Sequence, residues 1–133
     1  MEEVTEVKKD RQTALTDDLL AVIDSLKDEY SEITGVAVVS SDGFLIASRP
    51  DANDEQVSAM SAFLLSSAHK AAEGLGWSEL GYLVINHNDG YLVIADAGKA
   101  TLSLSTSPRA RLGLLLYDVR QAAKKIQKRI EEL

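Results

Sequence analysis

The sequence predicts an α+β domain in which helices cover both faces of an antiparallel sheet. The predicted strands are apolar at consecutive positions, as in residues 36–39, 82–85 and 91–94. Antiparallel sheets usually keep one face toward water, so strands that are apolar on both faces need a helical layer on each side. Short turns join the strands as hairpins, and amphipathic stretches flank them. The predicted order of elements is helix, two strands, helix, three strands, helix (αββαβββα).

Length and composition favour one soluble domain. The 133 residues suffice for a hydrophobic core, and the absence of cysteine excludes disulfides and thiolate metal sites. Residues 1–14 are polar and charged and are predicted to form a flexible N-terminal arm, and residues 15–133 form the domain. No stretch approaches the ~20 apolar residues of a membrane span, and no apolar signal core is visible. We therefore expect a cytoplasmic protein without a membrane span.

Charge is distributed unevenly along the chain. The formal net charge of -7 argues against nucleic acid as a partner. Residues 101–133 nevertheless contain seven Lys or Arg and three acidic residues, whereas residues 16–55 contain ten acidic residues and two basic ones. Either an acidic first helix lies beside a basic last helix as solvated faces, or the basic segment binds an acidic partner.

The first half of the predicted domain is a helix and a hairpin. Apolar residues recur at steps of three and four from Leu15, which indicates a helix ending near Glu29 with Thr16 as its N-cap. Strands are predicted over residues 35–39 and 44–47, joined by a turn that contains Asp42 and Gly43.

The second helix is predicted over residues 55–73, with Asn53 or Asp54 as its cap and a left-handed glycine at its end. The stripe expected to rest on the sheet consists of Val57, Met60, Leu64, Ser67, Ala71 and Leu75. The residues left on the surface are Ala62, Phe63, Leu65 and Ser66. Small residues let another backbone approach closely and apolar ones act as anchors, so this surface favours a protein partner. The alternative is a helix buried within its own domain.

The second half of the chain is predicted as three strands and a helix. The strands cover residues 80–86, 91–95 and 100–105, and their short links require antiparallel pairing. Ser107 is the expected N-cap of the last helix and Pro108 its first residue, because proline lacks the amide hydrogen that is unused there. This helix is expected to reach the C-terminus.

No catalytic motif is apparent. The chain has no phosphate-binding loop, no GxSxG motif and no cysteine, and its two histidines, His69 and His87, lack the spacing of a zinc site. Arg49, Arg109 and Arg111 lie near loops or helix ends, where arginine is common, and none is identified as an arginine finger. We expect no enzyme activity, cofactor or metal.

The ordered set of elements resembles the roadblock/LC7 family, in particular its prokaryotic MglB-like branch. The resemblance runs from Leu15 to Ile130 and rests on residues 33–39, 42–48, 90–96 and 112–115 and on the Ala- and Ser-rich second helix. It implies a profilin-like three-layer α/β/α fold with a five-stranded antiparallel sheet and the second helix alone on one face. It also implies a homodimer in which the second helix and third strand of each subunit meet.

The resemblance also implies a function. Family members bind Ras-like small GTPases, and the MglB-like branch includes GTPase-activating proteins that reorganise the switch regions without an arginine finger. The positions implied for GTPase contact are Ala59, Ala62, Phe63, Ser66 and Lys70. The positions implied for the dimer interface are Leu65, Ala68, His69, Ala72, Tyr82 and Val84.

Two other functions remain open. One is a small-ligand sensor of the PAS or GAF type, which needs an internal pocket. The sequence gives little sign of such a pocket, because small side chains are abundant and only seven residues (four Tyr, two Phe and one Trp) are aromatic. The other is a pure dimerisation scaffold without effect on GTP turnover.

Overall fold

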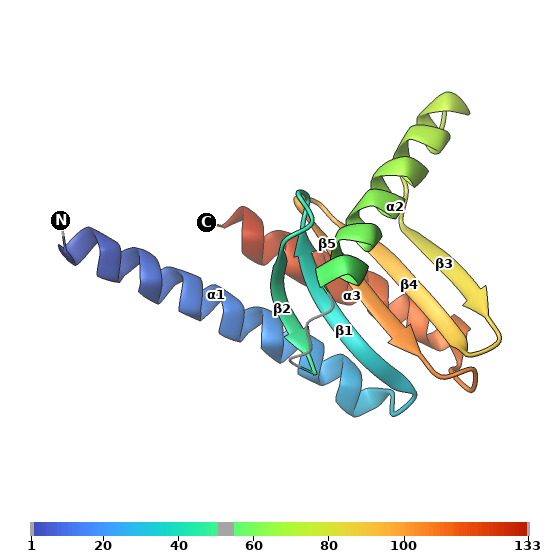
Figure 1. Cartoon of the computed structure of the whole chain (residues 1–133), viewed down its shortest axis with the longest axis horizontal. Helices are drawn as coiled ribbons and strands as arrows, with labels where there is room; N and C mark the ends of the chain where they lie inside the picture. Colours follow the sequence, from blue (N-terminus) through green and yellow to red (C-terminus); the bar gives the residue numbers. More distant parts are fainter. Residues whose placement is uncertain (1, 51–54, 133) are drawn as a thin grey trace.

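The computed structural model describes residues 2–50 and 55–132 (Figure 1). It contains five antiparallel strands in the order β2-β1-β5-β4-β3, so β2 and β3 are the two edges. The predicted αββαβββα order is confirmed. The elements are α1 (Glu2–Glu29), β1 (Ile33–Ser40), β2 (Leu45–Arg49), α2 (Glu55–Gly74), β3 (Tyr82–His87), β4 (Gly90–Ala97), β5 (Ala100–Thr106) and α3 (Leu112–Glu131).

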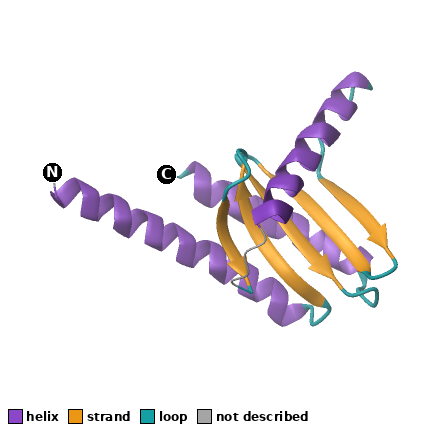
Figure 2. Cartoon of the chain, viewed as in Figure 1, coloured by secondary structure: helices purple, strands orange, loops and turns teal. Residues whose placement is uncertain are grey.

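The three-layer arrangement is confirmed: α1 and α3 cover one face of the sheet and α2 covers the other (Figure 2). Side-chain alternation along β5 defines the two faces. Leu102 and Leu104 belong to the core cluster that contains side chains of α1 and α3. Ser103 lies between them and points to the opposite face, where its Oγ is 3.0 Å from Oγ of Ser61 on α2 in a hydrogen bond.

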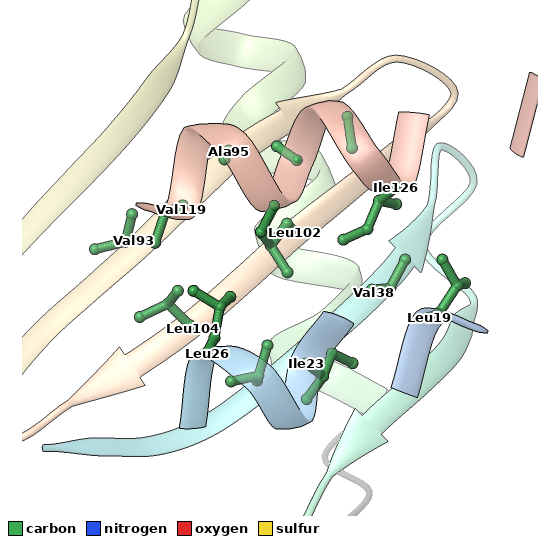
Figure 3. Packing of buried hydrophobic residues seen from close by; sticks show 14 of the residues in the cluster. Leu19, Ile23, Leu26, Val38, Val93, Ala95, Leu102, Leu104, Val119 and Ile126 are labelled. Carbon is green, nitrogen blue, oxygen red and sulfur yellow. The ribbon is translucent and has the colours of Figure 1, made fainter. Parts of the chain in front are cut away.

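The core lies between the sheet and the α1–α3 layer (Figure 3). Large aliphatic side chains fill it from both helices, and burial of each contributes about 1.5–3 kcal/mol. The fully buried helical residues are Leu19, Ile23, Leu115, Val119 and Ile126. The α2 layer differs, since most of its buried side chains are small. They are Ser58, Ser61, Ala62, Leu65 and Ala72.

The start of α1 differs from the prediction. The sequence predicts an arm over residues 1–14, but the helix begins at Glu2 and extends past the sheet (Figure 1). Glutamate, lysine, arginine and glutamine favour helix, and extending an existing helix costs far less than nucleating one. Missing apolar periodicity in this segment therefore does not indicate missing helix.

Of the two predicted ends of α2, only the C-terminal one lies within the described residues. The cap expected at Asn53 or Asp54 lies outside the described residues. At the other end, Gly76 has φ +77, and the Trp77 and Gly76 amides donate to the carbonyls of Ala72 (2.9 Å) and Glu73 (3.0 Å). This Schellman arrangement confirms the left-handed glycine.

The predicted start of α3 is wrong, because this helix begins at Leu112 instead of Pro108. Ser107 does act locally: its Oγ accepts the Arg109 amide and its carbonyl accepts the Ala110 amide, both at 3.3 Å. These bonds close a turn. Serine followed by proline suits the first positions of a turn as well as those of a helix, so the pair alone does not distinguish the two.

Polar contacts join α1 and Tyr30, the residue that follows it, to α3 near both ends of α3. Arg129 Nε lies 2.5 Å from a carboxylate oxygen of Asp18. The Tyr30 hydroxyl donates to the Asp118 carboxylate and lies 3.1 Å from the Leu114 carbonyl oxygen. Burial and the neighbouring Asp118 raise the pKa of Tyr30 from 10.0 to about 12. Part of the basic end of α3 thus lies beside the acidic α1, which is the first of the two charge arrangements considered for the sequence.

Tyr30→Phe should remove part of the pH dependence of stability. Because the folded-state pKa of Tyr30 is above its unfolded value of 10.0, the stabilisation is complete below pH 10 and is lost as pH rises to about 12. Urea unfolding at about pH 9 and about pH 11 should show a smaller difference for the variant than for the wild type. Tyr117→Phe, at an exposed tyrosine of α3, is the control and should behave as wild type. Equal pH dependence in all three proteins would contradict the assignment.

Candidate functional site

The outer surface of α2 is apolar and exposed. Phe63 is 63% exposed, and Val57 and Met60 are exposed beside it. Figure 1 shows that α2 crosses the sheet obliquely and that its C-terminal part extends past the strands. Neighbouring large apolar side chains on the surface of a small domain indicate an interaction surface.

The predicted sheet-facing stripe of α2 is wrong. Val57, Met60, Ser67, Ala71 and Leu75 are exposed, and Leu64 is half-buried. The residues that face the sheet are the small set named above, with Ala68 and His69 half-buried at its margin. The α2 face of the sheet presents Thr101 and Ser103 together with the fully buried Val39 and Ile94, and α2 packs closely over them. Serine and alanine fit closely there, and larger side chains remain outside.

Most residues expected to contact a GTPase are exposed on α2. Ala59, Phe63, Ser66 and Lys70 all have exposed side chains. Ala62 is the exception and a correction, because it is only 9% exposed and lies on the sheet side. Its small size serves close packing of α2 on the sheet.

Of the residues expected at the dimer interface, some are buried and the others are half-buried. Leu65, 5% exposed, and Ala72 are buried on the sheet side of α2, which corrects their prediction as surface residues. Ala68 and His69 are half-buried, and Nε2 of His69 lies 3.2 Å from a carboxylate oxygen of Asp96 on β4. On β3, Tyr82 and Val84 are half-buried and pack against the core cluster on the α3 side. The predicted interface residues therefore do not share one exposed surface.

Other exposed apolar residues lie after α2 and on β3 and were missed by sequence reasoning. Leu75 and Trp77 follow the last turn of α2, and Trp77 is 65% exposed. Ile85 is exposed on the edge strand β3. The available signal was the apolar pair at 75 and 77, which continues past the glycine that ends the helix.

The two flanks of α2 have different surroundings. Ala59 lies at the β1–β2 turn, since a Cβ at Gly43 would be 3.3 Å from its Cα. Val57, on the opposite flank, lines an open groove of about 280 Å³ together with residues of β1, β2, β4 and β5. Leu64 and Ala71 share that flank, because they follow Val57 at seven-residue spacing. One flank therefore carries the small Ala59, and the other carries the apolar Val57, Leu64 and Ala71.

The two edges of the sheet are not equally open to pairing. β2 has a register shift opposite Val38 and Val39 and is followed by Pro50. Bulges and prolines of this kind protect edge strands from pairing. β3 pairs with β4 without interruption from Tyr82 to His87 and contains neither proline nor a Lys, Arg, Asp or Glu. β3 is therefore the edge that is open to another strand.

Comparisons with known proteins identify the class to which this fold belongs. The Roadblock/LC7 domain matches residues 19–105, and the chain belongs to this family. An uncharacterized protein of Methanocaldococcus jannaschii is 34% identical over 97 residues, which cover 71% of this chain and 85% of the relative.

Two solved MglB structures share the fold. The gliding protein MglB from Thermus thermophilus is 19% identical, covers 90% of this chain and 93% of its own, and has a TM-score of 0.81. An MglB with tetrameric arrangement is 20% identical, covers 90% and 92%, and has a TM-score of 0.80. At this identity the likeness shows the fold.

Three further observations concern the described part of the chain. None of its helices is long and apolar enough to cross the bilayer. It contains no group of three His, Asp or Glu side chains arranged to hold a metal ion. The grooves found there, of about 260–310 Å³, open to solvent, whereas a PAS- or GAF-type sensor encloses its ligand.

The Ser61–Ser103 hydrogen bond should stabilise the seating of α2 on the sheet. Ser61→Ala leaves the buried Ser103 hydroxyl without a partner and should lower the free energy of unfolding by about 1–3 kcal/mol. Ser103→Ala should lower the free energy of unfolding less in the Ser61→Ala protein than in the wild type. Urea unfolding of the wild type, the two single variants and the double variant measures this coupling. The exposed Ser67→Ala is the control, expected to change little. Full additivity would show that the two hydroxyls do not act together.

Proposed function

We propose that the chain is a homodimeric cytoplasmic regulator of a Ras-like small GTPase and has no catalytic residues of its own. The observation that carries the proposal is the exposed apolar surface of α2 beside the open edge β3. Membership of the Roadblock/LC7 family and the fold shared with MglB support it. The MglB with tetrameric arrangement is an example of self-association on this fold.

The dimer forms by antiparallel pairing of β3 with β3 of a second copy. A twofold axis perpendicular to the sheet makes this pairing, joins the two five-stranded sheets and keeps both α2 helices on one face. The apolar flank of α2, with Leu64, Ala71 and Leu75, faces the second copy, and Trp77 lies close to the same edge. These residues replace the buried Leu65 and Ala72 as interface residues.

The GTPase binds the outer surface of the paired α2 helices. Ala59 and Ser66 are small enough to admit its backbone, Phe63 supplies an apolar anchor, and Lys70 supplies a charge. α2 contains no arginine, so this surface offers no arginine finger. The dimer regulates by binding one conformation of the switch regions better than the other, because only differential affinity shifts such an equilibrium.

A dimerisation scaffold without effect on turnover uses the same surfaces. Measurements of GTPase binding and of GTP hydrolysis distinguish a regulator from a scaffold. A regulator binds GDP- and GTP-loaded GTPase with different affinity or changes the hydrolysis rate, and a scaffold does neither.

Leu64→Glu should convert the dimer to a monomer. The substitution places a carboxylate on the apolar flank of α2, where a second copy would leave it buried and unpaired. Light scattering should show half the mass of the wild type, and circular dichroism should show an intact fold. Lys70→Glu, exposed on the same helix but outside that flank, is the control and should remain dimeric. A Leu64→Glu protein that stays dimeric would refute this interface.

Ser66→Arg should block GTPase binding while leaving the dimer intact. A long charged side chain prevents close approach at that position, and we expect Kd to rise at least about tenfold, or about 1.4 kcal/mol. The measurement is titration of a Ras-like GTPase of the same organism, loaded with GDP or with a non-hydrolysable GTP analogue, followed by turnover assays. Ser25→Arg, an exposed serine of α1 in the opposite layer, is the matched control. Unchanged affinity of Ser66→Arg would rule out this surface.

A further inference from the structure

The outer surface of the α1–α3 layer has an acidic half and a basic half. Residues 15–29 of α1, which overlap α3, contain five acidic residues and one lysine. α3 contains five Lys or Arg and two acidic residues. Among the described residues, Asp18 and Arg129 form the only ion pair between the two helices. Most of the charge on this surface therefore has no ion-pair partner within one copy.

On α1, unpaired carboxylates occupy the side that faces away from the sheet. Asp18 turns toward α3 and Asp24 toward β2, and each forms an ion pair there. Asp17 and Asp28 are exposed and three helical turns apart, so they share the side between those two flanks, opposite the buried Leu26. Neither forms an ion pair with a described residue. This side of α1 is the acidic ridge.

On α3, the side that faces away from the sheet is basic near the end of the helix and apolar near its start. Lys124 lines the groove toward the start of β3, and Lys125 lines the groove toward α1. Lys128 is exposed and lies between these two flanks. Leu114 and Tyr117, which are 60% and 66% exposed, continue the same side toward the start of α3. This side of α3 is the basic ridge.

The two carboxylates of α3 lie on its flanks and not on the basic ridge. Asp118 accepts the hydroxyl of Tyr30, the residue that follows α1. Glu131 accepts the side-chain amide of Gln127 at 3.0 Å. Gln127 in turn lies against the β4–β5 turn, because a Cβ at Gly98 would be 2.8 Å from its Cγ. Both carboxylates are therefore hydrogen-bonded within the copy, and the basic ridge keeps a net positive charge.

The contact between the two helices fixes how the charges are placed along them. α1 and α3 run antiparallel, since α1 begins and α3 ends on the same side of the molecule (Figure 1). Asp18 contacts Arg129 across the pair. The adjacent Asp17 and Lys128 therefore lie at nearly the same level along the helices, about 3 Å apart at a rise of about 1.5 Å per residue.

A second copy fits this surface when a twofold axis runs parallel to the helices, midway between α1 and α3. The rotation places α1 of each copy over α3 of the other and keeps every residue at its level along the helices. Asp17 of each copy then meets Lys128 of the other, and Asp28 lies over the part of the basic ridge that contains Tyr117. A twofold axis across the helices would instead place the two acidic ridges against each other, which like-charge repulsion opposes.

We propose that the outer surface of the α1–α3 layer binds a second copy of this chain back to back, with each acidic ridge against the basic ridge of the other copy. The contact uses neither α2 nor β3, so it is independent of the dimer in the proposed function. α3 has 20 residues and is about 30 Å long, and two helices each about 10 Å wide bury roughly 600 Å² per copy. Because a standard interface buries about 800 Å² per partner, the association is weak and requires concentrated protein.

Light scattering of the full chain over a range of concentrations tests the contact. At about 0.15 M salt, screening beyond about 8 Å weakens the repulsion between two copies of net charge -7 and leaves contacting pairs effective. From about 0.01 to about 1 mM protein, the weight-average mass should rise at least about twofold above its dilute value. If the dimer of the proposed function also forms, each dimer carries two such surfaces and the mass rises further.

Charge reversal tests the contacting residues. Lys128→Glu and Asp17→Lys should each raise Kd at least about tenfold, because like charges then meet on both sides of the axis. An equal mixture of the two variants should regain the association, since every contact between unlike variants joins opposite charges. Asp42→Lys, at the exposed β1–β2 turn beside α2, makes the same change in net charge as Asp17→Lys and should associate as wild type. Circular dichroism checks the fold of each variant.

The opposing outcomes are distinct from those of the proposed function. A wild-type mass that stays constant from about 0.01 to about 1 mM would overturn the back-to-back contact. Association that persists in both single variants, that Asp42→Lys removes equally, or that the mixture fails to regain would also overturn it. A wild type that is dimeric when dilute but gains no mass refutes this contact alone. A wild type that is monomeric when dilute, and whose association depends on Lys128, supports this contact and refutes the dimer of the proposed function.

Discussion

Packing of α1 and α3 against one face of the sheet is the interaction on which the rest of the structure depends. Leu19, Ile23, Leu115 and Ile126 are fully buried in that layer and supply the large aliphatic surface of the core. The opposite layer contains mostly small α2 residues with Leu65, the aliphatic Val39 and Ile94 of the sheet, and the Ser61–Ser103 hydrogen bond. Apart from Leu65, the large side chains of α2 do not face the sheet, and Val57, Met60 and Phe63 remain available on the surface.

The fold class could be predicted from sequence because it depends on local signals. Asp42 and Gly43 specify a tight turn whatever surrounds them, and consecutive apolar residues in the strands require two covering layers. The orientation of α2 could not be predicted in the same way. A hydrophobic stripe such as Val57, Leu64 and Ala71 indicates a packing surface. Its pattern does not distinguish packing on the chain's own sheet from packing on a second molecule.

The candidate site was predicted in part for the same reason. Phe63 and Ser66 are exposed as expected, whereas Ala62 lies against the sheet. Small residues permit close approach on any side of a helix, so their spacing alone cannot tell sheet packing from partner binding. The face of the sheet determines which side of α2 packs against it. That its serine and threonine side chains contact α2 is seen only in the three-dimensional structure.

The division of the molecule into two layers also determines how its surfaces can influence each other. α2 carries the proposed GTPase surface, α3 lies on the other face, and the sheet separates the two. Contacts between them therefore run past the edge formed by β4 and the residue before β3, where His69 of α2 meets Asp96 of β4 and Arg120 of α3 lies over Gly81. If partners on the two faces affect each other's affinity, the coupling must be equal in both directions. Asp96 is where the two layers meet, because its carboxylate contacts His69 of α2 and also lines the groove that borders Arg120 of α3.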